Sequence, residues 1–124
     1  MKIASFPDGS DACPLVRLFH FRPGEVERLR QACRKLADGR CAVALHDEAW
    51  VESVDGSRLV LRAAADDAGA TKCAHAPDFV LELSSEGWRE VEEKVIALQT
   101  GTDGWNWLAE DGDVRVLVSQ SGHW

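Results

Sequence analysis

Two stretches of helical periodicity, set among short runs of β-forming residues, constrain the fold of this chain most strongly. Apolar residues recur at steps of three and four in residues 23–37 and again in residues 84–99. This spacing predicts amphipathic helices, because it places the apolar side chains on one face. The starts of both helices are marked, the first by a proline and the second by serines that are suited to N-caps. A glycine after each segment marks the end of the helix. Two helices are therefore expected, and each needs a surface on which to bury its apolar face.

Short β-forming runs account for most of the remaining chain. Two of these runs are interrupted by an Asp-Gly pair, which favours a tight turn between antiparallel strands. Strands are expected at residues 13–21, 41–46, 50–63 (a hairpin), 78–83 and 105–119 (a second hairpin). Residues 64–76 are small and polar, so they are predicted to form a long loop.

The order of these segments predicts a single α+β domain over residues 1–124. The length of 124 residues is that of one ordinary domain with one hydrophobic core. Strands joined by tight turns form antiparallel pairs. We therefore expect a mainly antiparallel sheet of about six to seven strands with the two amphipathic helices packed on it.

Composition and charge argue against several classes of protein. The chain is 45% hydrophobic and 28% charged, which is typical of a globular protein. It has no apolar run of about 18 residues, the length that a transmembrane helix needs, and its first residues lack the apolar segment of a signal peptide. A net charge of −7 repels nucleic-acid phosphates at long range. We therefore expect a cytoplasmic protein that contacts neither a membrane nor nucleic acid.

The two tryptophans of the last hairpin could belong to the core or to a ligand platform. If the Asp-Gly pair after Glu110 forms a two-residue turn, Trp107 pairs with Val116 and Trp105 with Val118. Side chains alternate along a strand, so both tryptophans then share one apolar face with the valines. Burial of that face explains both tryptophans without a ligand, and core packing is the expected outcome.

Three other side chains are candidates for contact with a partner. Trp124 follows His123, and this pair either folds back over the edge of the core or presents the indole to a partner. Trp50 is the first residue of the first expected hairpin. If the protein works by binding, we expect an exposed apolar patch that contains Trp124 or Trp50.

A small hydrolase- or isomerase-like enzyme is the alternative. His46 ends an expected strand, and on an extended chain the side chain of Glu48 points to the same side. Such a pair can perform acid–base chemistry, and His20 would join it if the two strands are neighbours. The simpler interpretation is that these are polar residues at strand ends.

The four cysteines indicate reduced thiols rather than disulfides or a redox motif, because no pair has CxxC spacing. Cys33 and Cys41 lie in apolar segments and are expected to be core residues. Cys73 and His75 are candidate zinc ligands, but a structural zinc site needs about four ligands. A solvated loop is the favoured interpretation of that pair.

These observations favour a non-catalytic binding module without a cofactor. An enzyme of this size usually shows a recognisable cluster of His, Cys, Asp or Glu, whereas a small sheet has edges to cover and aromatic side chains that can anchor an interface. The expected partner is a protein or a small ligand, and a homodimer would also fit.

Overall fold

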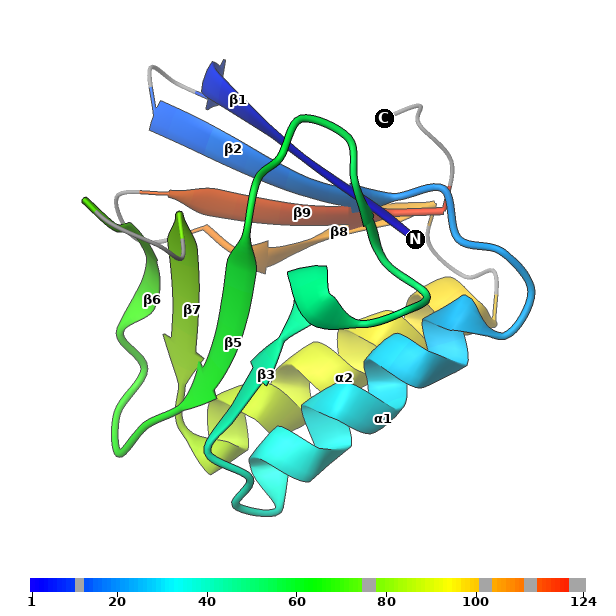
Figure 1. Ribbon diagram of the computed structural model, residues 1–124. Coiled ribbons are helices and arrows are strands. Elements are labelled where there is room, and N and C mark those ends of the chain that lie inside the picture. The colour runs from blue at the N-terminus through cyan, green and yellow to red at the C-terminus, as the bar shows by residue number, and fades with distance from the viewer. Residues whose placement is uncertain (11–12, 75–77, 101–103, 111–113, 121–124) are drawn as a thin grey trace.

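The computed structural model describes residues 1–10, 13–74, 78–100, 104–110 and 114–120 (Figure 1). Within these residues two α-helices, α1 (Glu25–Ala37) and α2 (Ser85–Gln99), accompany nine strands and one short 3-10 helix, η1 (Leu45–Asp47). The strands are β1 (Lys2–Ser10), β2 (Cys13–Phe19), β3 (Ala42–Ala44), β4 (Glu52–Ser53), β5 (Leu59–Ala63), β6 (Gly69–Lys72), β7 (Phe79–Leu83), β8 (Trp105–Ala109) and β9 (Arg115–Ser119).

The strands form two mixed sheets. The five-stranded sheet has the order β4-β1-β2-β9-β8, and the four-stranded sheet has the order β3-β5-β7-β6. The pairs β1–β4, β2–β9 and β5–β7 are parallel, and the other pairs are antiparallel. The prediction of an α+β protein is confirmed, but the prediction of one mainly antiparallel sheet of about six to seven strands is wrong. Parallel pairs join strands far apart in the sequence, so turn signals do not reveal them.

One hydrophobic core joins the inner faces of both sheets to the helices. Its members include Ile3, Val16, Leu18, Leu29, Leu36, Leu59, Leu61, Phe79, Leu81, Trp88, Val91, Val95, Leu98, Val116 and Val118. The two helices lie side by side below the sheets, and among the described residues no helix covers the other face of the five-stranded sheet (Figure 1). None of the helices in the described ranges is long and apolar enough to cross a membrane.

Both predicted helices are confirmed, with small changes at their starts. α1 begins at Glu25 rather than residue 23, because Gly24 adopts a left-handed conformation with φ of 84°. α2 begins after Ser84, whose hydroxyl accepts a hydrogen bond from the Gly87 N–H at 3.1 Å. This bond satisfies one of the amide donors that every helix leaves open at its first turn.

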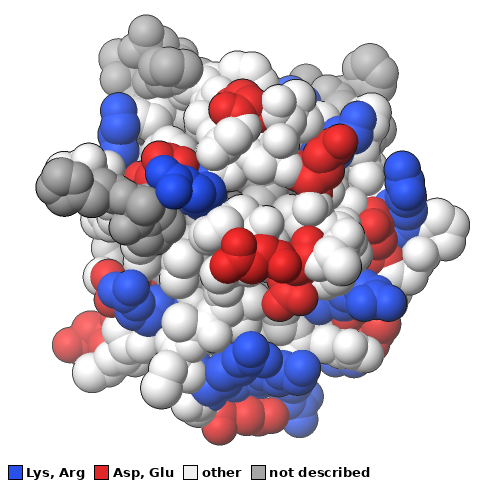
Figure 2. All heavy atoms as spheres, in the orientation of Figure 1, with Lys and Arg blue, Asp and Glu red and all other residues white. Residues whose placement is uncertain are grey.

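An ion-pair cluster joins the two helices. Arg30 of α1 donates to Glu92 of α2 at 2.8 Å and to Glu27 of its own helix at 2.8 Å. Arg34 lies 3.7 Å from the same Glu92 carboxylate. On the face shown in Figure 2, basic side chains lie next to acidic ones in several places. The two helices are therefore held together by charge as well as by their apolar stripes.

The strands differ from the predicted ones in three places. β1 and β6 are unexpected, and β6 divides the predicted loop of residues 64–76. The predicted hairpin of residues 50–63 is wrong, because β4 pairs with β1 whereas β5 lies between β3 and β7. The Asp-Gly turn at residues 55–56 therefore connects two sheets. Short segments such as these become strands through the neighbours they pair with, more than through their own propensity.

Acid is expected to destabilise this fold, because carboxylates that hold it together have lowered pKa values. Hydrogen bonds from Arg30 lower the pKa of Glu27 to about 2. Bonds from the backbone and the hydroxyl of Ser84 lower the pKa of Asp67. A carboxylate with a lower pKa in the folded state stabilises the fold above its unfolded pKa, and this contribution is lost as pH falls toward the folded pKa. We expect the urea midpoint to change little from about pH 7 to pH 5 and to fall between about pH 4.5 and pH 2.

Urea unfolding followed by circular dichroism at a series of pH values measures this effect. Glu27→Gln and Asp67→Asn should each reduce the fall of the urea midpoint at acidic pH, because an amide does not titrate. Glu90→Gln, which changes an exposed glutamate of α2, serves as the matched control and should leave the fall unchanged. An identical fall in all three variants would contradict the assignment to Glu27 and Asp67.

Candidate functional site

The C-terminal hairpin forms as predicted, but its register differs. β8 and β9 are antiparallel, and Trp107 lies opposite Leu117 rather than Val116. The register shifts between Trp107 and Ala109, as in a β-bulge, where one strand carries an extra residue. The extra residue reverses which side chains face the core. The prediction that Trp105 and Trp107 are core residues is therefore wrong.

The two tryptophans instead lie on the outside of the sheet. Trp105 is 47% exposed and Trp107 is half-buried. Their rings meet edge to face, with centroids 6.2 Å apart. Leu108, between Trp107 and Ala109, is buried in the core in their place. A role of the two tryptophans as a ligand platform, the alternative to core packing, stays a prediction.

The outer face of the five-stranded sheet, here called the aromatic face, follows from the strand registers. One row across it runs from Ala4 through Arg17 and Leu117 to Trp107. Residues two positions away on each strand point in the same direction. The aromatic face comprises Lys2, Ala4, Phe6, Leu15, Arg17, Phe19, Trp105, Trp107, Arg115, Leu117 and Ser119, with Glu52 of β4 at its edge.

Arginines stack on the aromatic rings of this face. The Arg17 guanidinium lies 4.4 Å from the ring centroid of Phe19 and 5.2 Å from that of Phe6. The guanidinium of Arg115 lies 6.0 Å from the Trp107 ring. Such cation–π contacts contribute about 0.5–1 kcal/mol each at exposed sites. Because the leucines of the face are fully buried, these stacked side chains form part of a second apolar layer outside the main core.

The aromatic face combines exposed aromatic rings with positive charge. Phe6 is 40% exposed, and it and Trp105 are two of the four exposed large hydrophobic residues among those described. Among its described side chains, the face carries three basic ones and one acidic one, Glu52, which lies 3.9 Å from Lys2. The whole chain, in contrast, has a net charge of −7. The face is therefore a basic and partly apolar area on an acidic protein.

Two predicted site residues, His20 and Trp50, line one cavity of about 220 Å³ beside the turn from β2 to α1. His20 has a φ of 53°, a left-handed conformation that is uncommon for residues other than glycine. Trp50 packs partly buried against the core, and its carbonyl accepts a hydrogen bond from the Met1 amine at 3.0 Å. A partner-binding role for Trp50 stays a prediction.

His46 and Glu48, the other proposed catalytic residues, belong to a different part of the fold. β3 ends at Ala44, so His46 lies in η1 and not at the end of a strand. Its Nδ1 lies 3.3 Å from the Leu59 carbonyl, and the backbone N–H of Glu48 donates to Leu45. The ring of His20, in contrast, packs edge-on against Phe19. The contacts of the two histidines are thus with different elements, and a catalytic group stays a prediction.

The remaining predicted site residues lie partly outside the described residues. Cys73 follows β6 and is half-buried, and its N–H donates to the Asp78 carbonyl at 2.8 Å. His75, His123 and Trp124 lie outside the described residues, so the metal-binding and partner-binding hypotheses built on them stay predictions. Within the described ranges, no group of three or more His, Cys, Asp or Glu could hold a metal ion.

The two cysteines expected in the core behave differently. Cys33 of α1 is buried, as predicted, and burial raises the pKa of its thiol to about 12. A thiol with this pKa is protonated at neutral pH and is a poor nucleophile. Cys41 is exposed just before β3, so the prediction that it is a core residue is wrong.

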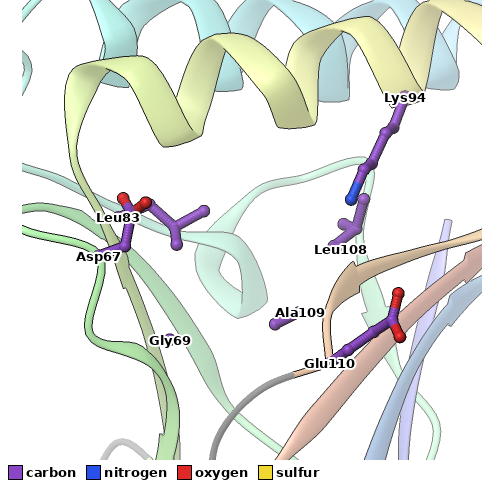
Figure 3. A pocket seen from close by; sticks show the side chains of 7 residues that line it. All are labelled: Asp67, Gly69, Leu83, Lys94, Leu108, Ala109 and Glu110. Atoms are coloured by element: carbon purple, nitrogen blue, oxygen red, sulfur yellow. The ribbon is translucent and has the colours of Figure 1, made fainter.

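A cleft between α2, the end of β8 and the start of β6 is a second candidate site (Figure 3). Its volume is about 350 Å³, and its lining residues are Asp67, Gly69, Leu83, Lys94, Leu108, Ala109 and Glu110. Sequence reasoning missed this site, because its charged residues come from three distant segments and form no motif. Only the packing of the two sheet edges against α2 brings them together.

No protein-family model matches the chain, and it matches neither a curated protein nor a solved structure.

Proposed function

We propose that the protein is a non-catalytic binding module that takes a protein partner on the aromatic face. The observation that carries this proposal is the exposure of Phe6 and Trp105 on a sheet face that no described helix covers. Exposed apolar area rimmed by polar groups is typical of interaction sites. Tryptophan and arginine are also the residue types that contribute most to the energy of protein interfaces.

The charge of the aromatic face indicates the chemistry of the partner. The face has an excess of basic side chains, whereas the chain as a whole is acidic. An acidic and apolar partner surface is therefore attracted to this face and repelled by the rest of the molecule. A second copy of the chain would place one basic face against another, which disfavours a homodimer through this surface.

The rigidity of the aromatic face supports the same function. Its residues lie on paired strands, and Arg17 already stacks between two aromatic rings. Side chains held in place before binding lose little conformational entropy when a partner arrives. Binding of a partner to this face therefore loses less free energy to the ordering of side chains.

Fluorescence anisotropy with a labelled synthetic peptide of alternating glutamate and leucine tests this proposal. The protein should bind this peptide, and Trp105→Ala and Phe6→Ala should each weaken binding about tenfold. Ile96→Ala removes an equally exposed apolar side chain from α2 and should leave binding unchanged. The same peptide with lysine in place of glutamate should bind more weakly.

Three results would overturn the proposal. Equal binding by Trp105→Ala and Ile96→Ala would show that the aromatic face is not the contact surface. If a single-stranded oligonucleotide binds and its binding is lost in Trp105→Ala, the partner of this face is a nucleic acid and not a protein. A dimer in light scattering that Trp105→Ala dissociates would make the partner a second copy of the chain.

A further inference from the structure

The cleft beside α2 has an asymmetric arrangement of charge. Lys94 of α2 and Glu110, which follows β8, lie on one side of it, and Asp67 lies on the other (Figure 3). The apolar side chains of Leu83, Leu108 and Ala109 complete its lining. Two residues of opposite charge, Lys94 and Glu110, thus lie on the side of the cleft opposite Asp67, with apolar side chains between the two sides.

Asp67 is held in a fixed position at the start of α2. The N–H and the hydroxyl of Ser84 both donate to Oδ1 of Asp67, each at 2.8 Å. Gly87 allows this close approach, because a Cβ at that position would lie 2.5 Å from the same oxygen. Since both hydrogen bonds reach Oδ1, the second carboxylate oxygen can accept from a ligand.

Lys94 is also held in place, on the opposite side. Its Nζ donates to the Trp107 carbonyl of β8 at 2.9 Å. An ammonium has three N–H donors, so this bond fixes the position of the charge and leaves capacity for an anionic ligand group. The cleft therefore has charged groups positioned by hydrogen bonds before any ligand arrives.

We propose that this cleft binds a basic α-amino acid of the lysine or ornithine type. The α-carboxylate would pair with Lys94 and the α-ammonium with Glu110, which line the same side of the cleft. The alkyl chain then covers the apolar lining, and the side-chain ammonium reaches Asp67.

Charge and size both agree with this ligand class. The three charged lining residues carry two negative charges and one positive charge, which a ligand of net charge +1 complements. A volume of about 350 Å³ lies within the range of small-molecule sites. The proposal is independent of the aromatic face, because it depends on different side chains.

Isothermal titration calorimetry with three matched ligands tests the site. L-Lysine carries all three charged groups, L-norleucine lacks the side-chain ammonium, and cadaverine lacks the carboxylate. L-Lysine should bind with saturation, and each of the other two should bind at least about tenfold more weakly.

Variants assign each charged group of the ligand to its residue. Asp67→Asn should weaken lysine binding about tenfold and leave norleucine binding unchanged, because the lost contact involves the side-chain ammonium. Lys94→Gln should weaken lysine binding and leave cadaverine binding unchanged. Glu110→Gln is a third variant on an exposed residue, away from the helix cap, and should also weaken lysine binding. Lys72→Gln, on β6 outside the cleft, is the matched control and should bind lysine as the parent does.

Equal affinity for the three ligands, or no saturation by lysine at millimolar concentration, would overturn the proposal. Equal weakening of lysine and norleucine by Asp67→Asn would overturn it as well, because that result would indicate a structural effect. Asn at position 67 keeps the oxygen that accepts from Ser84, so the fold of this variant is expected to persist.

Discussion

Trp88→Ala is expected to lower the free energy of unfolding by about 3–5 kcal/mol. Trp88 is 0% exposed, and it is the largest fully buried side chain among the described residues. Its truncation removes apolar contacts in the hydrophobic core and leaves a cavity. The indole Nε1 also donates to the Arg62 carbonyl of β5 at 3.0 Å, and this acceptor loses its partner. Since domains of this size are stable by about 5–15 kcal/mol, the loss is a large share of the total.

Two further variants separate the causes of this loss. Trp88→Phe keeps an aromatic ring but loses the hydrogen bond and some volume, so we expect a loss of about 1–2 kcal/mol. Trp105→Ala makes the same truncation on the aromatic face, where much of the ring is already in water, and should cost less than about 1 kcal/mol. Urea unfolding followed by circular dichroism measures all three. Equal losses for Trp88→Ala and Trp105→Ala would contradict the burial of the first and the exposure of the second.

The helices could be predicted from the sequence because their signals are local. An apolar stripe and the residues at its ends lie within one segment, so nothing elsewhere in the chain needs to be known. The cap of α2 shows this well, since Ser84 and the amide that it accepts from are three residues apart. The burial of Cys33 follows from its place on such a stripe, and it could be predicted for the same reason.

Apart from the β8–β9 hairpin, strand pairing could not be predicted, because many of the other pairs depend on partners far away in the sequence. The Asp-Gly turn at residues 55–56 has the local chemistry of a hairpin, yet the strands on its two sides join different sheets. β6 consists of small residues, and β7 supplies its pairing. Tertiary contacts decide such cases, and a short segment carries little trace of them.

The candidate sites were missed for related reasons. A single extra residue near Trp107 reverses the direction of the tryptophans, and the strand Trp105–Ala109 itself contains no glycine that would mark a bulge. The cleft depends on Asp67, Lys94 and Glu110, which only the folded chain brings together. Sequence reasoning did identify an aromatic surface as the alternative for Trp105. It favoured the core because a two-residue turn was the simplest geometry.

Glu92→Ala is expected to lower the free energy of unfolding by about 2–3 kcal/mol, because it removes the carboxylate that joins the two helices. Glu92 is 7% exposed, and it accepts from Arg30 at 2.8 Å with Arg34 3.7 Å away. Hydrogen bonds to charged groups contribute more than neutral ones, and a buried pair is less screened by water. Thermal or urea unfolding of the purified variant measures the loss.

The comparison with Glu92→Gln and Glu93→Ala isolates the role of charge. Glutamine keeps the size of the side chain and one oxygen acceptor, so a loss of about 1–2 kcal/mol for this variant is due mainly to the charge. Glu93 is the exposed neighbour on α2, and its truncation should change stability by less than about 0.5 kcal/mol. Because the Glu92 carboxylate is buried and the Arg30 side chain is partly buried, most of the loss for Glu92→Ala should persist at about 1 M salt, where surface ion pairs are screened. A loss that disappears at this salt concentration would place the Arg30–Glu92 pair among ordinary surface interactions.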